Sequence, residues 1–170
     1  MTQRKNGYYY YFVEGNDDRK VVNTLKSDFR IIVSGKVQKF NVVEEKLTKG
    51  HVRTLKNGTS VILVFDIDTE KVDVLKENIT FLLKQSNIKD VICVTQVMNL
   101  EEELVRSCSI KEIKELTKSK SNKDFKGDVL HISNLKGRLE ACGFDFAKFW
   151  NSRPVNAYKN IENSAHKIKI

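Results

Sequence analysis

The fold is decided by two short acidic stretches, VEGNDD at residues 13–18 and FDIDTE at residues 65–70. Each follows a run of strand-forming residues, 8–13 for the first and 61–65 for the second, and a helical pattern comes after each one. Strands that alternate with helices predict a parallel sheet, in which ligands bind at the carboxyl ends of the strands. We therefore expect the two stretches to form one acidic site at a single edge of a sheet.

The rest of the pattern predicts an α/β fold with a mostly parallel, doubly wound, Rossmann-like sheet. Further core elements are expected as strands at residues 29–33 and 91–95 and as helices at 41–55 and 69–85. After residue 97 the pattern changes to short amphipathic helices, expected at 100–108, 110–116, 135–142 and 144–150. We interpret residues 1–97 as the α/β core and residues 98–170 as a basic, helical C-terminal extension packed on the same domain.

The cysteines and the hydropathy pattern indicate a cytoplasmic protein. Cys93, Cys108 and Cys142 are widely spaced and form neither a CxxC pair nor a zinc-binding pattern, so we interpret them as reduced thiols. No apolar run approaches the roughly 18 residues of a membrane span, so we expect no membrane partner.

The basic residues are concentrated in the last third of the chain. The formal net charge is +8, and from Ser109 onward 13 Lys and Arg residues stand against 7 Asp and Glu residues. A basic region near an acidic site favours nucleic acid as the substrate, because a polyanion must approach carboxylates that repel it. The alternative is a lysine-rich face that serves solubility alone. The lysines that we expect to contact a nucleic-acid backbone are Lys36, Lys39, Lys118, Lys120 and Lys123.

The candidate metal ligands are Glu14, Asp66, Asp68 and Glu70. Carboxylates that converge at one sheet edge repel one another, and a cation stabilises their ionised forms. Mg²⁺, or Mn²⁺ in its place, prefers oxygen ligands and leaves positions open for water or phosphate. Asp66 and Asp68 stand two apart, so both point to the same side if the strand continues through them. We therefore expect Glu14, Asp66 and Asp68 to be the catalytic residues of a phosphoryl chemistry.

These motifs resemble the TOPRIM domain, which is shared by topoisomerases, bacterial primases, the overcoming-lysogenization-defect nucleases and the maturase of 5S ribosomal RNA. The resemblance spans residues 8–95, and its pattern is Glu14-Gly15 after a first strand with Asp66-x-Asp68 after a third. The form VEGxxD at residues 13–18 looks most like the small bacterial nuclease branch. The order DxDxE at residues 66–70 looks like the topoisomerase and primase version of the second motif.

The resemblance implies a role for each matching residue. Glu14 matches a glutamate that acts as general acid/base or metal ligand, and Asp66 and Asp68 match aspartates that hold Mg²⁺. Glu70 matches a third acidic position found in some branches, and Gly15 matches a glycine that lets the backbone turn beside the phosphate. It also implies a nuclease that cuts DNA or RNA, often with an ATPase partner in defence against phage. A homodimer is the alternative to assembly with an ATPase.

The sequence departs from the family in several places, and other functions stay open. It lacks the topoisomerase glycine after Glu70, an active-site tyrosine context, and the zinc-binding and helicase-binding regions of a primase. One alternative is a TOPRIM-like module that binds nucleic acid or protein without turnover. Another is a phosphatase of the haloacid-dehalogenase type, because FDID at residues 65–68 resembles the nucleophile motif of those enzymes. Asp68 or Thr69 also fits a plain helix N-cap.

A third acidic run, Glu101 to Glu103, opens the helix expected at 100–108. One of these glutamates is a candidate extra metal ligand, because the run follows the fourth strand near the same sheet edge. The alternative is a solvated helix N-terminus, where the helix dipole favours negative charge. The sequence leaves the choice among the three glutamates open.

Overall fold

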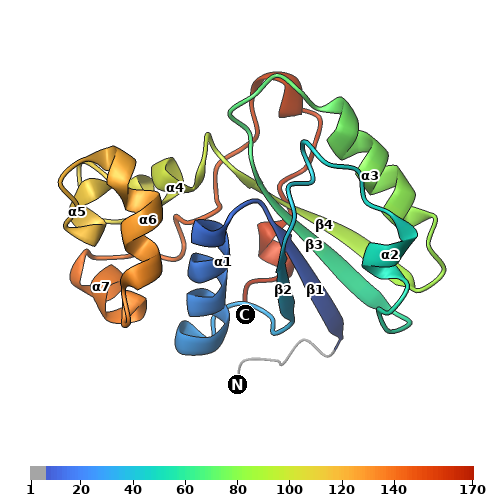
Figure 1. Ribbon diagram of the computed structural model, residues 1–170, viewed down its shortest axis with the longest axis horizontal. Coiled ribbons are helices and arrows are strands. Elements are labelled where there is room, and N and C mark those ends of the chain that lie inside the picture. The colour runs from blue at the N-terminus through green and yellow to red at the C-terminus, as the bar shows by residue number, and fades with distance from the viewer. Residues whose placement is uncertain (1–6) are drawn as a thin grey trace.

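The computed structural model describes residues 7–170, so the first six residues of the expected core lie outside the described residues. Four parallel strands form one sheet in the order β2-β1-β3-β4 (Figure 1). The strands are β1 (Tyr8–Val13), β2 (Lys36–Lys39), β3 (Thr59–Asp66) and β4 (Ile88–Gln96). Helices pack on both faces of the sheet. The α/β, doubly wound fold expected from the alternating pattern is confirmed.

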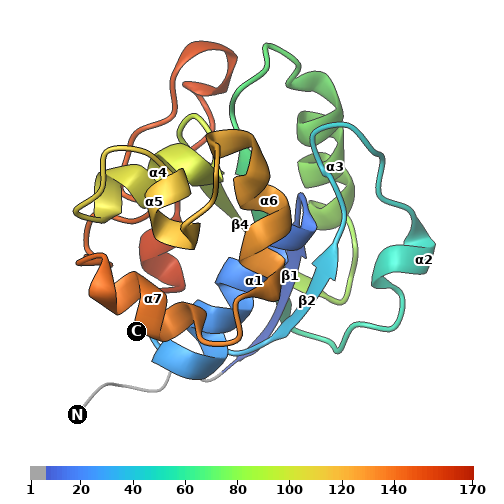
Figure 2. The same cartoon turned by 60° about the vertical axis from the view of Figure 1, so that its left-hand side comes forward.

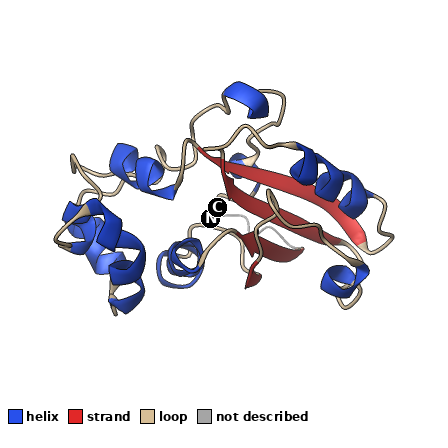
Figure 3. Ribbon diagram, turned by 45° about the horizontal axis from the view of Figure 1, so that its top comes forward, coloured by secondary structure: helices blue, strands red, loops and turns tan. Residues whose placement is uncertain are grey.

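Each face of the sheet has its own hydrophobic core. One core lies under α1 (Asn16–Asn23) and the C-terminal helices, and the other lies under α3 (Asp73–Leu83) (Figure 3). β3 lies between β1 and β4, and alternate residues of its apolar run 61–65 face the two cores. A strand buried on both faces is expected to be apolar throughout, which explains why this run is the clearest strand signal in the chain.

The C-terminal part packs on both faces of the sheet: its α-helices group beside α1, away from α3 (Figure 2), and its later residues Tyr158 and Ile161 lie in the core under α3. Its α-helices are α4 (Leu100–Ser107), α5 (Lys114–Thr117), α6 (Phe125–Asp128) and α7 (Leu135–Ala141). Short 3₁₀ turns connect or follow them: η2 (Asn122–Asp124), η3 (Val129–His131), η4 (Asn156–Tyr158) and η5 (Ala165–Lys167). The helices expected at 100–108 and 135–142 are found, and the one expected at 110–116 is shorter. Within residues 7–170, none of the helices has the length and apolar character needed to cross a membrane.

The strand predicted at residues 29–33 is wrong. The segment Thr24–Phe29 forms η1, a π-helical continuation of α1, and Arg30 ends it in a left-handed conformation with φ of 59°. The strand beside β1 is instead β2, which begins three residues after the end of the predicted strand. Ile32 is buried because it forms an isolated antiparallel bridge with Lys169, near the end of the chain. Burial by the distant C-terminus therefore accounts for the apolar residues of this segment.

The helix predicted at residues 41–55 is also wrong, since only the single turn of α2 (Lys49–Val52) forms. The side chain of Asn78, on α3, holds the preceding loop in place. Its Oδ1 accepts from the Leu47 N–H (2.8 Å), and its Nδ2 donates to the carbonyls of Val42 and Glu45 (both 2.8 Å). These bonds satisfy the backbone of a non-helical segment, so its apolar residues can pack on the sheet without a helix.

The helix predicted at residues 144–150 consists of turns. Phe144 and Phe149 pack with ring centroids 5.6 Å apart, and Phe149 and Trp150 are buried in the core under α1. The backbone reaches Trp150 in a left-handed conformation with φ of 57°, which a helix does not allow. The spacing of the aromatic residues in this region therefore reflects their packing in the core and does not indicate a helix.

The strand order places the two acidic stretches side by side. From β1 the chain continues to β2 on one side, whereas β3, on the other side, is followed by β4. β1 and β3 therefore lie at a topological switch point, with Val13 in register with Val64. Ligands of open α/β sheets bind outside the strand ends at such points. Both acidic stretches leave the sheet here.

Candidate functional site

Glu14 joins the ends of β1 and β3. Its Oε2 accepts a hydrogen bond from the backbone N–H of Asp66 (2.9 Å), and its Oε1 accepts from Nδ2 of Asn41 (3.1 Å). Asn41 follows β2, because the Phe40 N–H continues the ladder to the Val13 carbonyl (2.8 Å). Three neighbouring strands thus fix one carboxylate. The structure brings Glu14 and Asp66 together, as the two strand-end motifs predict.

A second carboxylate pair forms around Gln96, the last residue of β4. Its Nε2 donates to Oδ1 of Asp66 (2.7 Å) and to Oδ1 of Asp18 (2.8 Å). Asp18 lies in the first turn of α1, where its Oδ2 also accepts from the Gly15 N–H (2.9 Å). The Asp18 side chain and the Asp66 side chain are both buried. We call Glu14, Asp18, Asp66 and Gln96 the acidic site.

Gly15 has a different role from the one that the TOPRIM resemblance implies. Its backbone is extended, with φ of −135° and ψ of 178°, so the turn itself needs no glycine. A Cβ at this position would lie 2.6 Å from Oδ1 of Asp17 and 3.3 Å from Oδ2 of Asp18. A larger residue here would displace the Asp17 carboxylate, so glycine leaves room for the two carboxylates in the first turn of α1.

The electrostatics of the acidic site are those of crowded, buried carboxylates. Burial, together with the charges of Asp18 and Glu14, raises the pKa of Asp66 to about 9. Burial and the neighbouring Asp17 raise the pKa of Asp18 to about 7. Burial also raises the pKa of Glu14, against the lowering effect of its hydrogen bond from the Asp66 backbone. Without a cation, protons relieve this repulsion near neutral pH; a divalent cation would take their place.

Asp68 and Glu70 lie outside the buried cluster. The strand ends at Asp66, and Ile67 turns into the core, where its N–H donates to the carbonyls of Met98 (2.9 Å) and Gln96 (3.2 Å). Asp68 is exposed, although its charge still raises the pKa of Asp66. The strand therefore does not continue through Asp68, which was the condition for Asp66 and Asp68 to point to the same side. The expectation that Glu70 lies within a helix is wrong, because Glu70 is in an exposed bend and α3 begins later, after Val72 as N-cap.

Lys126, on α6, is the basic counterpart of the acidic site. Its Nζ lies 3.8 Å from Oε1 of Glu101. Burial lowers the pKa of Lys126, but the charges of Glu101, Asp17, Asp66 and Asp18 raise it overall. The lysine belongs to the basic C-terminal part and was not singled out by its sequence pattern. Its position could not be predicted because α6 is a single turn without a clear periodicity.

The glutamates of α4 divide into two kinds. Glu103 is fully buried and structural: its Oε1 accepts from the Val97 N–H (3.0 Å), its Oε2 accepts from the Trp150 N–H (2.9 Å), and Arg106 pairs with it at 2.9 Å. Glu101 is half-buried and faces Lys126, and burial is the main cause that raises its pKa. Of the three candidates, Glu101 is therefore the one next to the acidic site.

The five lysines predicted to contact nucleic acid are all exposed, in two separate places. Lys36 and Lys39 are the first and last residues of the edge strand β2. Lys39 is in register with Val13, at the same edge as the acidic site, whereas Lys36 pairs with Tyr10 further back. Lys118, Lys120 and Lys123 follow α5 or lie in η2, in the C-terminal part that also supplies Lys126.

The residues present fit a divalent, oxygen-seeking cation held by few protein ligands. Asp18 and Asp66 lie close enough to share one amide nitrogen of Gln96. Mg²⁺ is commonly bound by one or two carboxylates together with waters and substrate phosphates. Within residues 7–170, no three His, Cys, Asp or Glu side chains form a ready-made ligand set. Asp18 and Asp66 are therefore the pair of side chains that could hold such a cation.

Comparisons of the chain with protein-family models, with curated proteins and with solved structures found no match. The fold and the acidic site are therefore the features of the chain that bear on its function. They define a doubly wound α/β domain with buried carboxylates at its topological switch point.

Proposed function

We propose that the protein is a Mg²⁺-dependent, TOPRIM-type nuclease that hydrolyses phosphodiester bonds of DNA or RNA, with Mn²⁺ able to replace Mg²⁺. The observation that carries the proposal is the meeting of Asp18 and Asp66 on the Gln96 amide, at the switch point of the sheet. Buried, mutually repelling carboxylates are costly to keep unless a cation or a proton binds them. Perturbed carboxylates at a ligand-binding edge are typical of functional sites.

The chain's own residues take distinct parts in this proposal. Asp18 and Asp66 would hold the cation, and Asp68 could contact it through water from the rim. When bound, the cation neutralises charge on the phosphate and lowers the pKa of a coordinated water. Glu14 is held from two sides by Asn41 and the Asp66 backbone, so it can accept a proton from that water at a fixed position. Its raised pKa brings it nearer to neutral pH, which suits a general base.

Lys126 supports phosphate as the ligand of the acidic site. Its ammonium group is near four carboxylates and keeps its charge, because their attraction outweighs its burial. A cation placed across from a carboxylate-bound metal can stabilise the charge that develops on a phosphodiester during attack. The exposed lysines of the C-terminal part would extend this basic surface along a nucleic-acid backbone.

The TOPRIM resemblance extends the proposal beyond the chain itself. It suggests a nucleic-acid substrate, an ATPase partner and a role in defence against phage. A homodimer is the alternative assembly, and sedimentation analysis of the purified chain, alone and with an ATPase, would distinguish the two.

Cleavage of supercoiled plasmid and of structured RNA tests the proposed reaction. We expect the wild-type protein to cleave both substrates in Mg²⁺ or Mn²⁺ and to be inactive in EDTA. The Asp66→Asn and Glu14→Gln variants should lose the activity. Asp128→Asn is a matched control, because this exposed aspartate on α6 contacts Ser119 and lies outside the acidic site. Equal cleavage by all four proteins would refute the nuclease. Tight, metal-independent nucleic-acid binding that survives Asp66→Asn, without cleavage, would favour the non-catalytic module.

The phosphatase alternative has less support at Asp66. A haloacid-dehalogenase-type nucleophile must be ionised and free to attack, whereas Asp66 is buried, hydrogen-bonded to Gln96 and has a raised pKa. Hydrolysis of a small aryl phosphate, together with a trappable aspartyl adduct, would favour the phosphatase alternative.

A further inference from the structure

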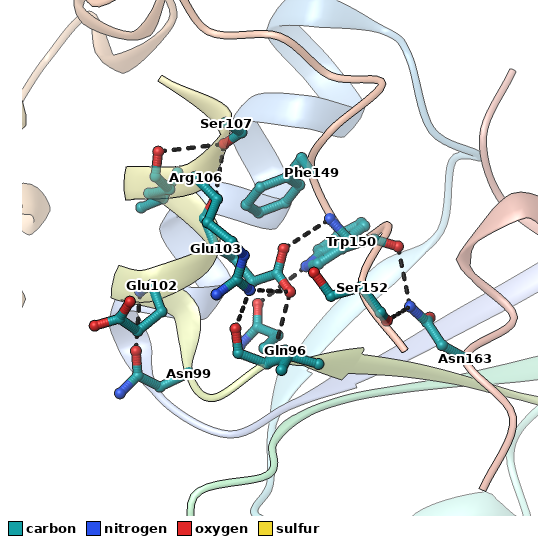
Figure 4. Close-up of polar contacts among 12 residues, drawn as sticks. Gln96, Asn99, Glu102, Glu103, Arg106, Ser107, Phe149, Trp150, Ser152 and Asn163 are labelled. Atoms are coloured by element: carbon teal, nitrogen blue, oxygen red, sulfur yellow. Dashed lines mark hydrogen bonds and ion pairs between the residues drawn. The ribbon is translucent and has the colours of Figure 1, made fainter. Parts of the chain in front are cut away.

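A line of buried hydrogen bonds connects the acidic site to the C-terminal segment. The indole Nε1 of Trp150 donates to Oε1 of Gln96 (3.1 Å; Figure 4). In turn, Nε2 of Gln96 donates to Asp18 and Asp66. Gln96 is 1 % exposed and Trp150 is 2 % exposed. Two residues far apart in the chain thus meet behind the carboxylates, where bulk water has little access.

The chemistry of these groups fixes the orientation of the Gln96 amide. An indole N–H can only donate, so the side-chain oxygen of Gln96 must face Trp150. The two amide hydrogens of Gln96 must then face the carboxylates. A reversed amide would place its oxygen against two carboxylates and its NH₂ against the indole N–H. At a buried position each of those mismatches is costly, since no solvent partner is at hand. Trp150 therefore determines which end of Gln96 the carboxylates meet.

Trp150 is itself held from several directions. Its backbone N–H donates to Oε2 of Glu103 (2.9 Å), and its carbonyl accepts from Nδ2 of Asn163 (3.0 Å). The Phe149 ring packs beside it at a centroid distance of 4.7 Å. Figure 4 shows the Glu103 and Gln96 side chains next to each other, both reaching Trp150. A glutamate with no solvent exposure and an asparagine thus set the position of the indole.

We propose that Trp150 is a positioning residue for the acidic site: acting through Gln96, it holds Asp18 and Asp66 at the spacing that one divalent, oxygen-seeking cation requires. We call the Trp150–Gln96 hydrogen bond and its two continuations the relay. The inference rests on the proposed cation site, though not on nuclease activity. The C-terminal segment is then part of the metal site and not only a nucleic-acid-binding surface.

The wild-type protein carries its own optical probe of the relay. Trp150 is the single tryptophan of the chain, so its fluorescence can be excited selectively. We expect Mg²⁺ and Mn²⁺ each to change the Trp150 emission in a saturable way, because a cation on the carboxylates alters the field at Gln96 and its indole partner. Asp66→Asn should abolish the change. An emission that stays constant while Mn²⁺ binds stoichiometrically would overturn the inference.

Mn²⁺ affinity, measured by electron paramagnetic resonance, tests the relay without fluorescence. We expect Trp150→Phe, which keeps a ring and loses the N–H, to weaken Mn²⁺ binding about tenfold, and Gln96→Leu to weaken it about 10- to 100-fold, the usual range for partners of metal ligands. The double variant should bind no more weakly than Gln96→Leu alone, because Trp150 acts through Gln96. Tyr11→Phe is the matched control, since it removes another buried hydrogen bond, to the Val33 carbonyl, from the same core.

The outcomes separate this inference from the proposed nuclease. Wild-type affinity in Trp150→Phe, or losses that add in the double variant, would leave a cation site without a relay. Emission change and weakened binding without any cleavage would retain the relay and remove the nuclease. An absence of Mn²⁺ binding by wild type would overturn both. If Trp150→Phe does not fold, as judged by thermal unfolding, the wild-type titration and Gln96→Leu still decide the matter.

Discussion

The ends of β1 and β3 carry similar acidic motifs but use them differently. After β1, α1 begins at once, and its first turn directs Asp18 into the protein, onto Gly15 and Gln96. After β3, α3 begins only at Asp73, and the intervening loop leaves Asp68 exposed. A helix that starts directly after a strand has backbone N–H groups that can hold a carboxylate, whereas a loop offers it to solvent. The distance from strand end to helix start thus decides which acids reach the site.

The largest effect on activity is expected when the buried aspartates are replaced by asparagine, compared with the same replacement of the exposed aspartate. Asp18→Asn and Asp66→Asn should each lower the kcat/KM of Mg²⁺-dependent cleavage about 100-fold, because each removes a charge that we assign to cation binding. Asp68→Asn should lower it no more than about fivefold, since an exposed charge contributes up to about 1 kcal/mol. Steady-state cleavage of a labelled oligonucleotide measures all three.

The reverse ranking would contradict the comparison of the two strand ends. A severe loss in Asp68→Asn with nearly full activity in Asp18→Asn would mean that the loop after β3 closes over the substrate and carries the metal. Glu70→Gln provides the background value, because its side chain is exposed in the bend before α3.

A second effect concerns stability and pH. The folded-state pKa values of Asp18 (about 7) and Asp66 (about 9) lie above the ordinary value, so the native state binds these protons more tightly than the unfolded chain does. Their contribution to stability is fully present below the ordinary carboxyl pKa of about 4. It is lost progressively as pH rises from there to the folded-state pKa values, about 7 for Asp18 and about 9 for Asp66, and the loss levels off above them. Without added cation, the free energy of unfolding should therefore fall over this window, as urea titrations at several pH values would measure.

Two comparisons sharpen that result. Asp66→Asn should flatten the pH dependence and raise the free energy of unfolding at pH 9 by roughly 1–3 kcal/mol, the range for an uncompensated buried polar group. Asp68→Asn should leave the wild-type slope in place. Mg²⁺ should restore stability to wild type at high pH, because binding favours the ionised carboxylates. A slope that Asp66→Asn does not change would mean that the buried pair is ionised without cost.

The sequence predicted the strands that carry the acidic site better than it predicted which residues form the site. Apolar runs at 8–13 and 61–65 located two strands, and the alternation with helices placed their ends together, so the meeting of Glu14 and Asp66 was foreseeable. Asp18 was visible in the VEGxxD pattern, yet spacing alone could not show that it turns inward while Asp68 turns outward. Gln96 and Trp150 carry no charge signal, and their contact depends on how a distant turn packs.

A third prediction compares two exposed lysines: Lys126, whose Nζ lies 3.8 Å from Oε1 of Glu101 beside the acidic site, and Lys118, at the end of α5. Lys126→Met should lower kcat about tenfold or more at saturating substrate, because its charge is placed to act on the reacting phosphate. Lys118→Met should keep kcat, weaken nucleic-acid binding, and reduce the dependence of log Kd on log salt concentration by about 1. Equal effects of both variants on kcat would place Lys126 on a general binding surface.

The smallest effect expected is at Asn41, which holds Glu14 from the side of β2. Its Nδ2 donates to Glu14, and its Oδ1 accepts from the Val43 N–H (3.1 Å), which shapes the turn. Asn41→Asp keeps the acceptor for Val43 but replaces the donor by a negative charge, so the pKa of Glu14 should rise further. The acidic limb of the kcat/KM profile for cleavage should move to higher pH by about 0.5 to 1 unit, with kcat on the plateau little changed. Asn41→Ala removes the donor without adding charge and should give a smaller shift. An acidic limb that stays in place in both variants would mean that Glu14 is not the proton acceptor, and that its hydrogen bonds serve only to join the ends of β1 and β3.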